Sequence, residues 1–174
     1  MTTTSRRATA TSALLASLTS LALLVPGAAH AERADLAEPP GDTAPELDIR
    51  YVTIDNRPTR LNVAVDLGRF DRQRTSVYAF VGGTGARRDD LFVVGWSSVR
   101  GERPGRLLGR LTEDGVERRT CEGLRIDVGR RGLDVSVPQR CLGPTAGTVK
   151  VGVLTERRTG RDADEVGPTR VRRG

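Results

Sequence analysis

Cys121 and Cys141 are the residues of this chain whose types and spacing define a chemistry most clearly. They enclose CEGLRIDVGRRGLDVSVPQRC, in which two runs of alternating apolar residues are separated by Gly-Arg-Arg-Gly. Because residues 1–31 have the pattern of an export signal, and cysteines of exported chains normally pair, we expect a disulfide that closes a β-hairpin. The alternatives are two free thiols or an intermolecular bond. A closed loop of about 20 residues adds roughly 3 kcal/mol of stability in the chain-entropy model.

The histidine content restricts catalysis. The one histidine is His30, which lies inside the predicted export signal, so the mature chain has none. Ser-His-Asp and Cys-His catalytic sites and histidine zinc sites are therefore excluded. Paired carboxylates remain, but nothing in the sequence places two of them at the defined separation that a glycosidase needs. We expect no enzymatic activity and no resident cofactor.

Calcium is the metal that the composition favours, because it needs only oxygen ligands. Asp162 and Asp164, followed by Glu165, form an acidic cluster beside basic residues and are the candidate ligands. The alternative is a solvated segment in which the charges balance one another.

Four other residues are candidates for contact with a ligand. Arg87 and Arg88 lie in the loop 82–90, which lacks the Gly-Lys-Ser/Thr of a phosphate-binding loop but could enter the specificity pocket of a protease. Tyr51 and Phe70 are the aromatic residues that we expect to be exposed, as in a sugar-binding module.

The N-terminus has the three parts of a secretory signal. Arg6 and Arg7 form its basic start, residues 13–25 its apolar core, and residues 29–31 a small-x-small cleavage site. We expect cleavage after Ala31 and a secreted, extracellular protein. General secretion is favoured over twin-arginine export, because the hydrophobic pair of a twin-arginine signal is absent. No lipoprotein cysteine and no second apolar segment follow, so we expect no membrane attachment after cleavage.

The net charge does not indicate nucleic-acid binding. Loss of Arg6 and Arg7 from the 28 basic residues leaves 26 against 22 acidic residues, a net charge of +4. These arginines alternate with Asp and Glu as on a solvated sheet, rather than forming a basic patch. We expect an unidentified extracellular ligand, no nucleic-acid partner and a monomer.

Period-two alternation and frequent turn signals predict an all-β domain, an antiparallel β-sandwich of eight or nine strands over residues 47–155. Two segments, 76–81 and 91–96, are apolar on both faces and should be central. We expect Val, Leu and Ile to fill the interior, with Phe80, Phe92 and Trp96 as its large side chains. The expected strands are 47–54, 61–67, 76–81, 91–96, 106–112, 116–120, 124–128, 133–137 and 148–155.

The hairpin between the cysteines has a defined register. With Gly129–Gly132 as the turn, Val128 faces Leu133, Ile126 faces Val135 and Leu124 faces Val137, which places all six apolar side chains on one face. The same register sets Cys121 opposite Arg140 rather than Cys141. We therefore expect a bulge or bend at Pro138 or at Glu122-Gly123.

Two segments flank the predicted sandwich. Residues 32–46 are rich in Pro, Ala and acidic residues without periodicity, which predicts a disordered lead-in. Residues 156–174 are highly charged and have the composition of a tail.

Five segments resemble a group of small secreted actinobacterial proteins of unknown function. They are 48–54, 61–65, 121–123, 137–142 and 164–174. The resemblance implies that the C-terminal segment packs on the sheet, and an architecture similar to that of carbohydrate-binding sandwich modules. We expect a secreted, non-catalytic binding or structural module. The alternatives are a carbohydrate- or calcium-binding module and then a protease inhibitor.

Overall fold

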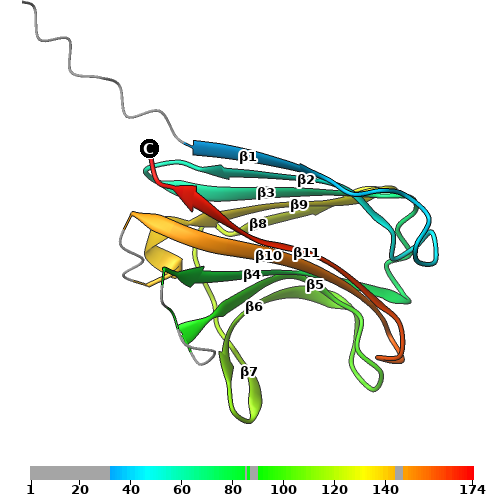
Figure 1. Ribbon diagram of the computed structural model, residues 1–174. Coiled ribbons are helices and arrows are strands. Elements are labelled where there is room, and N and C mark those ends of the chain that lie inside the picture. The colour runs from blue at the N-terminus through cyan, green and yellow to red at the C-terminus, as the bar shows by residue number, and fades with distance from the viewer. Residues whose placement is uncertain (1–31, 85, 87–89, 144–146) are drawn as a thin grey trace, which may run out of the picture.

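The computed structural model describes residues 32–84, 86, 90–143 and 147–174, which form two packed antiparallel sheets (Figure 1). One sheet has five strands in the order β1-β2-β3-β9-β8, and the other has six in the order β11-β10-β4-β5-β6-β7. The predicted β-sandwich is confirmed. Its strands are β1 (Glu32–Ala37), β2 (Ile49–Asn56), β3 (Arg60–Leu67), β4 (Thr75–Gly83), β5 (Phe92–Ser97), β6 (Gly105–Thr112), β7 (Gly115–Arg118), β8 (Arg125–Val128), β9 (Gly132–Pro138), β10 (Thr148–Arg157) and β11 (Ala163–Arg172).

The core lies between the sheets and follows the alternation of the strands. Successive side chains of a strand point to opposite faces, so every second residue can turn inward. On β3 the buried residues include Val63 and Val65, and on β4 they include Val77, Ala79 and Val81. The two segments expected to be central, now β4 and β5, are neighbours in the interior of the six-stranded sheet.

The hairpin formed by β8 and β9 has the predicted register. Val128 pairs with Leu133 and Ile126 with Val135, and the backbone closes the turn through Gly129 N–H and Gly132 O at 2.9 Å. Leu124 lies just before β8 and is outside the ladder. The one-residue mismatch is absorbed after Pro138 by a 3₁₀ turn over Gln139–Cys141.

The Cys121–Cys141 disulfide is present, with 6.0 Å between the two Cα atoms. Both cysteines are partly buried and pack against the core. The bond thus links the start of the β8–β9 hairpin to the turn that follows β9, at the edge of the five-stranded sheet.

The prediction of a disordered lead-in over residues 32–46 is wrong. Residues Glu32–Ala37 form β1, which pairs along its whole length with β2. Ala34 and Leu36 alternate with charged residues and pack against the core. The apolar alternation of this segment is weak because it is short and rests partly on alanine. The strand is therefore stabilised mainly by its hydrogen-bonded pairing with β2 rather than by its own strand preference.

The charged C-terminal segment forms a strand rather than a free tail, as the resemblance implied. β11 pairs with β10, and its Val171 is fully buried. Its end also reaches the other sheet, because the Asn56 side-chain amide donates to the Val171 carbonyl at 3.0 Å and Gly174 N–H donates to the Asn56 carbonyl at 3.2 Å. β11 therefore joins the two sheets along one edge.

Two aromatic residues lie where we did not expect them. Phe70 was expected to be exposed but is 7% exposed, because the segment after β3 folds back and its amide donates to the Arg130 carbonyl at 3.2 Å. Phe80 was expected in the interior, but it shares the outward face of β4 with Tyr78. Phe92 and Trp96 do pack in or against the core.

Candidate functional site

A second apolar cluster lies outside the sandwich, on the outer face of the six-stranded sheet. Tyr78, Val93 and Leu107 are 7%, 2% and 6% exposed although they point away from the main core. Three partly buried side chains pack against them, and these are Phe80, Leu111 and Leu154. The cluster spans four neighbouring strands, β10, β4, β5 and β6. No further layer covers it among the described residues.

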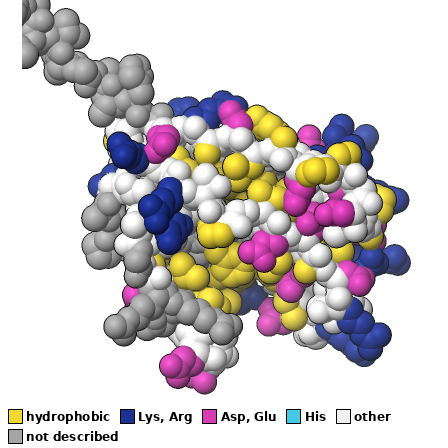
Figure 2. All heavy atoms as spheres, viewed as in Figure 1, with side chains coloured by type: hydrophobic (Ala, Val, Ile, Leu, Met, Phe, Trp, Pro, Cys, Tyr) yellow, Lys and Arg dark blue, Asp and Glu magenta, His cyan; other side chains and the backbone are white. Residues whose placement is uncertain are grey.

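This face is hollowed into what we call the outer groove. It consists of two adjoining hollows of about 370 and 420 Å³, which share Phe80, Leu111 and Leu154. Both volumes fall within the range of small-molecule sites. In Figure 2, apolar side chains gather between β10 and the β6–β7 hairpin, and Figure 1 shows β7 projecting below the sheet beside them.

One glycine determines how closely β7 approaches the groove. A Cβ added to Gly109 would lie 2.3 Å from Val116 Cγ1 and 2.8 Å from the Glu117 carbonyl oxygen. Only glycine therefore allows β7 to close on β6 and set Val116 at the wall of the groove.

Polar groups line the groove at several points along its length. At one end the Tyr78 hydroxyl donates to Ser97 Oγ at 3.2 Å and also interacts with the Glu156 carboxylate. Burial raises the pKa of both Tyr78 and Glu156 above their ordinary values. Lys150 lies toward the opposite end of β10, and Glu165 is opposite Leu154 in the β10–β11 ladder. The ion pair of Arg118 and Glu102 also lines the groove, and most of the remaining lining residues are apolar.

The aromatic pair in the groove does not form a flat platform. The rings of Tyr78 and Phe80 lie edge to face, with centroids 6.4 Å apart and planes at 64°. This geometry suits contact with an apolar chain or ring edge more than flat stacking against a sugar ring.

The ligand-facing residues predicted from sequence are not brought together. Tyr51 is 39% exposed on the outer face of the five-stranded sheet, far from the outer groove in the topology. Phe70 is in the core, so these two aromatics do not form a sugar site. Arg87 and Arg88 lie outside the described residues.

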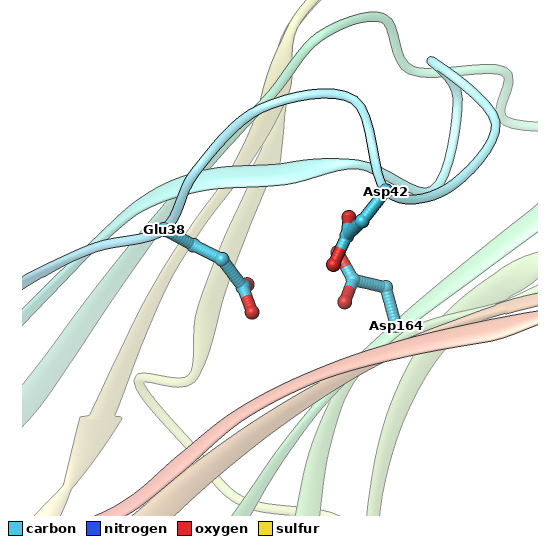
Figure 3. Close-up of side chains that lie close together, drawn as sticks. All are labelled: Glu38, Asp42 and Asp164. Atoms are coloured by element: carbon cyan, nitrogen blue, oxygen red, sulfur yellow. The ribbon is translucent and has the colours of Figure 1, made fainter.

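A group of carboxylates lies at the edge where β11 meets the β1–β2 connection. Glu38, Asp42 and Asp164 each offer an oxygen within 4.8 Å of the others (Figure 3). Asp164 is 7% exposed and accepts hydrogen bonds from the amides of Ile49 and Glu165 at 2.8 and 2.9 Å. It therefore also ties β11 to β2. We call these three residues the acidic cluster.

Glu38 contributes to the acidic cluster a buried carboxylate oxygen without a hydrogen-bond partner among the described residues. Its Oε2 atom is enclosed and no donor reaches it within the described part of the chain. Burial raises the pKa of Glu38, and the negative charges of Asp164, Asp42 and Asp48 raise it further. A cation with oxygen ligands would relieve this repulsion.

The structure does not bring together Asp162 and Asp164, the two calcium ligands expected from the sequence. Asp162 forms an ion pair with Arg157 at 2.8 Å and is not part of the acidic cluster, whereas Asp164 is. Sequence reasoning missed Glu38 and Asp42 because both lie in the segment interpreted as disordered. The acidic composition of that segment was the available signal.

Comparisons with known proteins give no assignment. No protein-family model, no curated protein and no solved structure matches the chain. Within the described residues, no helix is long and apolar enough to cross a membrane. Function has to be inferred from the outer groove and the acidic cluster themselves.

Proposed function

We propose that this chain is an exported, non-catalytic binding module that holds a small ligand with an apolar body in the outer groove. The observation that supports this proposal is the partly buried apolar lining of the outer groove, which consists of Phe80, Leu111 and Leu154 packed on the outer-face cluster. An antiparallel sheet that faces water on one side normally alternates apolar and polar residues. A contiguous apolar surface is typical of binding sites.

The lining of the outer groove favours an apolar ligand over a sugar. A sugar needs many hydrogen-bonding groups along its length and flat aromatic surfaces. Here most of the lining residues are apolar, and the Tyr78 and Phe80 rings are edge to face. The carbohydrate-binding alternative therefore lacks support from the geometry.

Export and the absence of catalysis rest on other features. The Cys121–Cys141 disulfide is compatible with an oxidising compartment, and the signal pattern of residues 1–31 supports secretion. The mature chain would have no histidine, which excludes the common nucleophile–base pairs.

Filling the groove tests the proposal. Gly152 lines it, and an added Cβ would meet the Val166 carbonyl oxygen and Pro168 at ordinary contact distances of 3.7 and 3.8 Å. Gly152→Val should leave the melting temperature nearly unchanged and weaken the binding of octanol, measured by titration calorimetry, by roughly tenfold. Gly83→Val is the control, because Gly83 is a strand glycine with open space that lies outside the groove. Equal octanol affinity in both variants, or no binding to the unmodified protein, would contradict the proposal.

A second candidate function is the binding of calcium by the acidic cluster. The observation that favours it is the enclosed Glu38 Oε2 without a hydrogen-bond partner beside two other carboxylates. Calcium alone should raise the melting temperature. Asp42→Asn should abolish the rise because it removes one carboxylate of the cluster, and it should leave the fold intact because Asp42 is exposed. Asp127→Asn, on β8, should retain it. Persistence of the rise in Asp42→Asn, or no rise with the unmodified protein, would exclude this site.

A further inference from the structure

We infer that the ligand of the outer groove has a cationic head group, which pairs with Glu156 while its apolar body lies along Phe80 and Leu154. This inference rests on the proposed function, since it specifies the chemistry of the ligand in the same groove.

Glu156 is placed to receive such a group. It follows Leu154 on the outward face of β10, lines the hollow that contains Tyr78 and Leu107, and is partly buried. The Tyr78 hydroxyl interacts with its carboxylate and also bonds to Ser97. The same hollow also contains the ion pair of Arg118 and Glu102, so Glu156 is the carboxylate of this hollow that has no ion-pair partner among the described residues.

The nearby arginines bind other groups. Arg118 forms an ion pair with Glu102 at 2.6 Å. Arg158 donates to the Gln73 and Glu102 carbonyls at 3.4 and 3.5 Å. Among the described residues, no Lys or Arg forms an ion pair with Glu156, and the neighbouring Arg157 pairs with Glu46 at 3.0 Å and with Asp162 at 2.8 Å.

The chain itself therefore leaves the charge of Glu156 uncompensated. Partial burial of a carboxylate without a cation is unfavourable, because the group loses water and gains no opposite charge. A ligand cation would supply that charge at the moment when the ligand displaces the remaining water. Glu165, opposite Leu154 in the β10–β11 ladder, is another carboxylate of the groove, but it is exposed, so water already screens its charge.

The competing arrangement is an anionic head group at Lys150, with the body in the opposite direction. A cationic head group at Glu156 and an anionic head group at Lys150 would leave the ligand body in the same apolar contacts. The two arrangements therefore differ only in the charge of the ligand that binds more tightly. Octylammonium, octanol and octanoate are suitable probes, because they share one apolar body and differ in charge.

The test is calorimetric titration of the protein with each of the three probes at neutral pH. Octylammonium should bind roughly tenfold more tightly than octanol, as expected for one partly desolvated ion pair, and octanoate should bind most weakly. Glu156→Gln should abolish the preference for octylammonium, measured as the ratio of the octylammonium and octanol affinities of the same variant. Glu165→Gln is the matched control, because Glu165 is an exposed carboxylate of the same groove, opposite Leu154, and this variant should retain the preference.

The outcomes distinguish this inference from the proposed function. If octanol binds but octylammonium has no advantage, or if octanoate binds best, the inference is wrong and the groove remains a binding site. A preference that persists in Glu156→Gln, or that disappears in Glu165→Gln, overturns the role of Glu156. If none of the probes binds, the proposed function itself fails.

Discussion

The two outer faces of the sandwich differ in chemistry although both belong to antiparallel sheets over the same core. The outer face of the five-stranded sheet presents Thr53, Asn62, Asp66, Asp134 and Ser136, which are polar and alternate with buried apolar residues. The outer face of the six-stranded sheet presents the apolar side chains of the outer groove. Folding requires only the inner faces to be apolar, so the difference indicates a second role for the six-stranded sheet.

The comparison also separates stability from binding. The disulfide lies at the edge of the five-stranded sheet and constrains the β8–β9 hairpin. The outer groove lies on the opposite side and uses β10, β4, β5 and β6. Substitutions in the two regions should therefore affect different measurements.

The largest expected effect is on stability. Cys121→Ser with Cys141→Ser should lower the free energy of unfolding by roughly 3 kcal/mol, because the open chain gains conformational freedom when unfolded. Chemical denaturation measures this loss. Octanol affinity, measured at a temperature where the variant is folded, should not change; a parallel loss of affinity would show that the two sheets are coupled.

The next largest effect distinguishes two aromatic side chains, Phe80 in the outer groove and Tyr51 on the outer face of the five-stranded sheet. Phe80→Ala should weaken octanol binding roughly tenfold, since it removes a large part of the groove wall, and should lower the free energy of unfolding by about 1 kcal/mol. Tyr51→Ala, on the polar face, should leave octanol affinity unchanged. Calorimetric titration of both variants with octanol measures the two affinities. Equal losses of octanol affinity would contradict the claim that only the outer face of the six-stranded sheet binds the ligand.

A smaller effect concerns the edge that joins the sheets. The pKa of Glu38 is raised in the folded protein, so the folded state holds its proton more tightly than the unfolded state and stability falls as pH rises past the ordinary carboxyl range. Glu38→Gln removes this loss. In metal-free buffer it should raise the free energy of unfolding at neutral pH by a few tenths of a kcal/mol, since solvent screens the charges, and should have no effect in acid.

Glu122→Gln is the control for that measurement, because the Glu122 side chain is 97% exposed. Melting temperatures of both variants across the acid-to-neutral range provide the comparison. A gain for Glu38→Gln that is the same at all pH values would show that repulsion among carboxylates is not the cause.

The smallest effect lies on the polar face. Asp127 and Asp134 are directly opposite each other in the β8–β9 ladder, and like charges in that position repel. Asp134→Asn should stabilise the protein by about 0.3 kcal/mol at low salt and by less at high salt. Asp66→Asn should give no gain, because Asp66 already pairs with Arg131 at 3.2 Å. A loss of stability in Asp134→Asn would contradict this account of the polar face.

Local patterns were sufficient to predict most of the fold. Clear alternation and turn chemistry predicted the β8–β9 register, and apolar residues on both faces predicted the central position of β4 and β5. The presence of two cysteines behind an export signal predicted the disulfide. The weak alternation around Ala34 and Leu36 was not sufficient for β1, because the evidence for that strand is the ladder with β2.

The functional surfaces were less predictable, for two physical reasons. Apolar residues on both faces of β4 are expected for a strand covered by another layer on each side and also for a strand with a ligand-binding outer face. The three-dimensional structure is needed to show that no further layer of the described residues covers the outer face. The acidic cluster depends on contacts between distant segments, as in the hydrogen bond from Ile49 to Asp164 across 115 positions. Sequence spacing contains no information about such a contact.

The central claim, that the outer face of the six-stranded sheet binds an apolar ligand, is tested most directly by mapping amide chemical shifts during titration with octanol. We predict progressive shifts in β4, β5, β6 and β10, around Phe80, Leu111 and Leu154, with the strands of the five-stranded sheet unaffected. Shifts confined to β2, β3 and β9, or no shifts at all, would contradict the account.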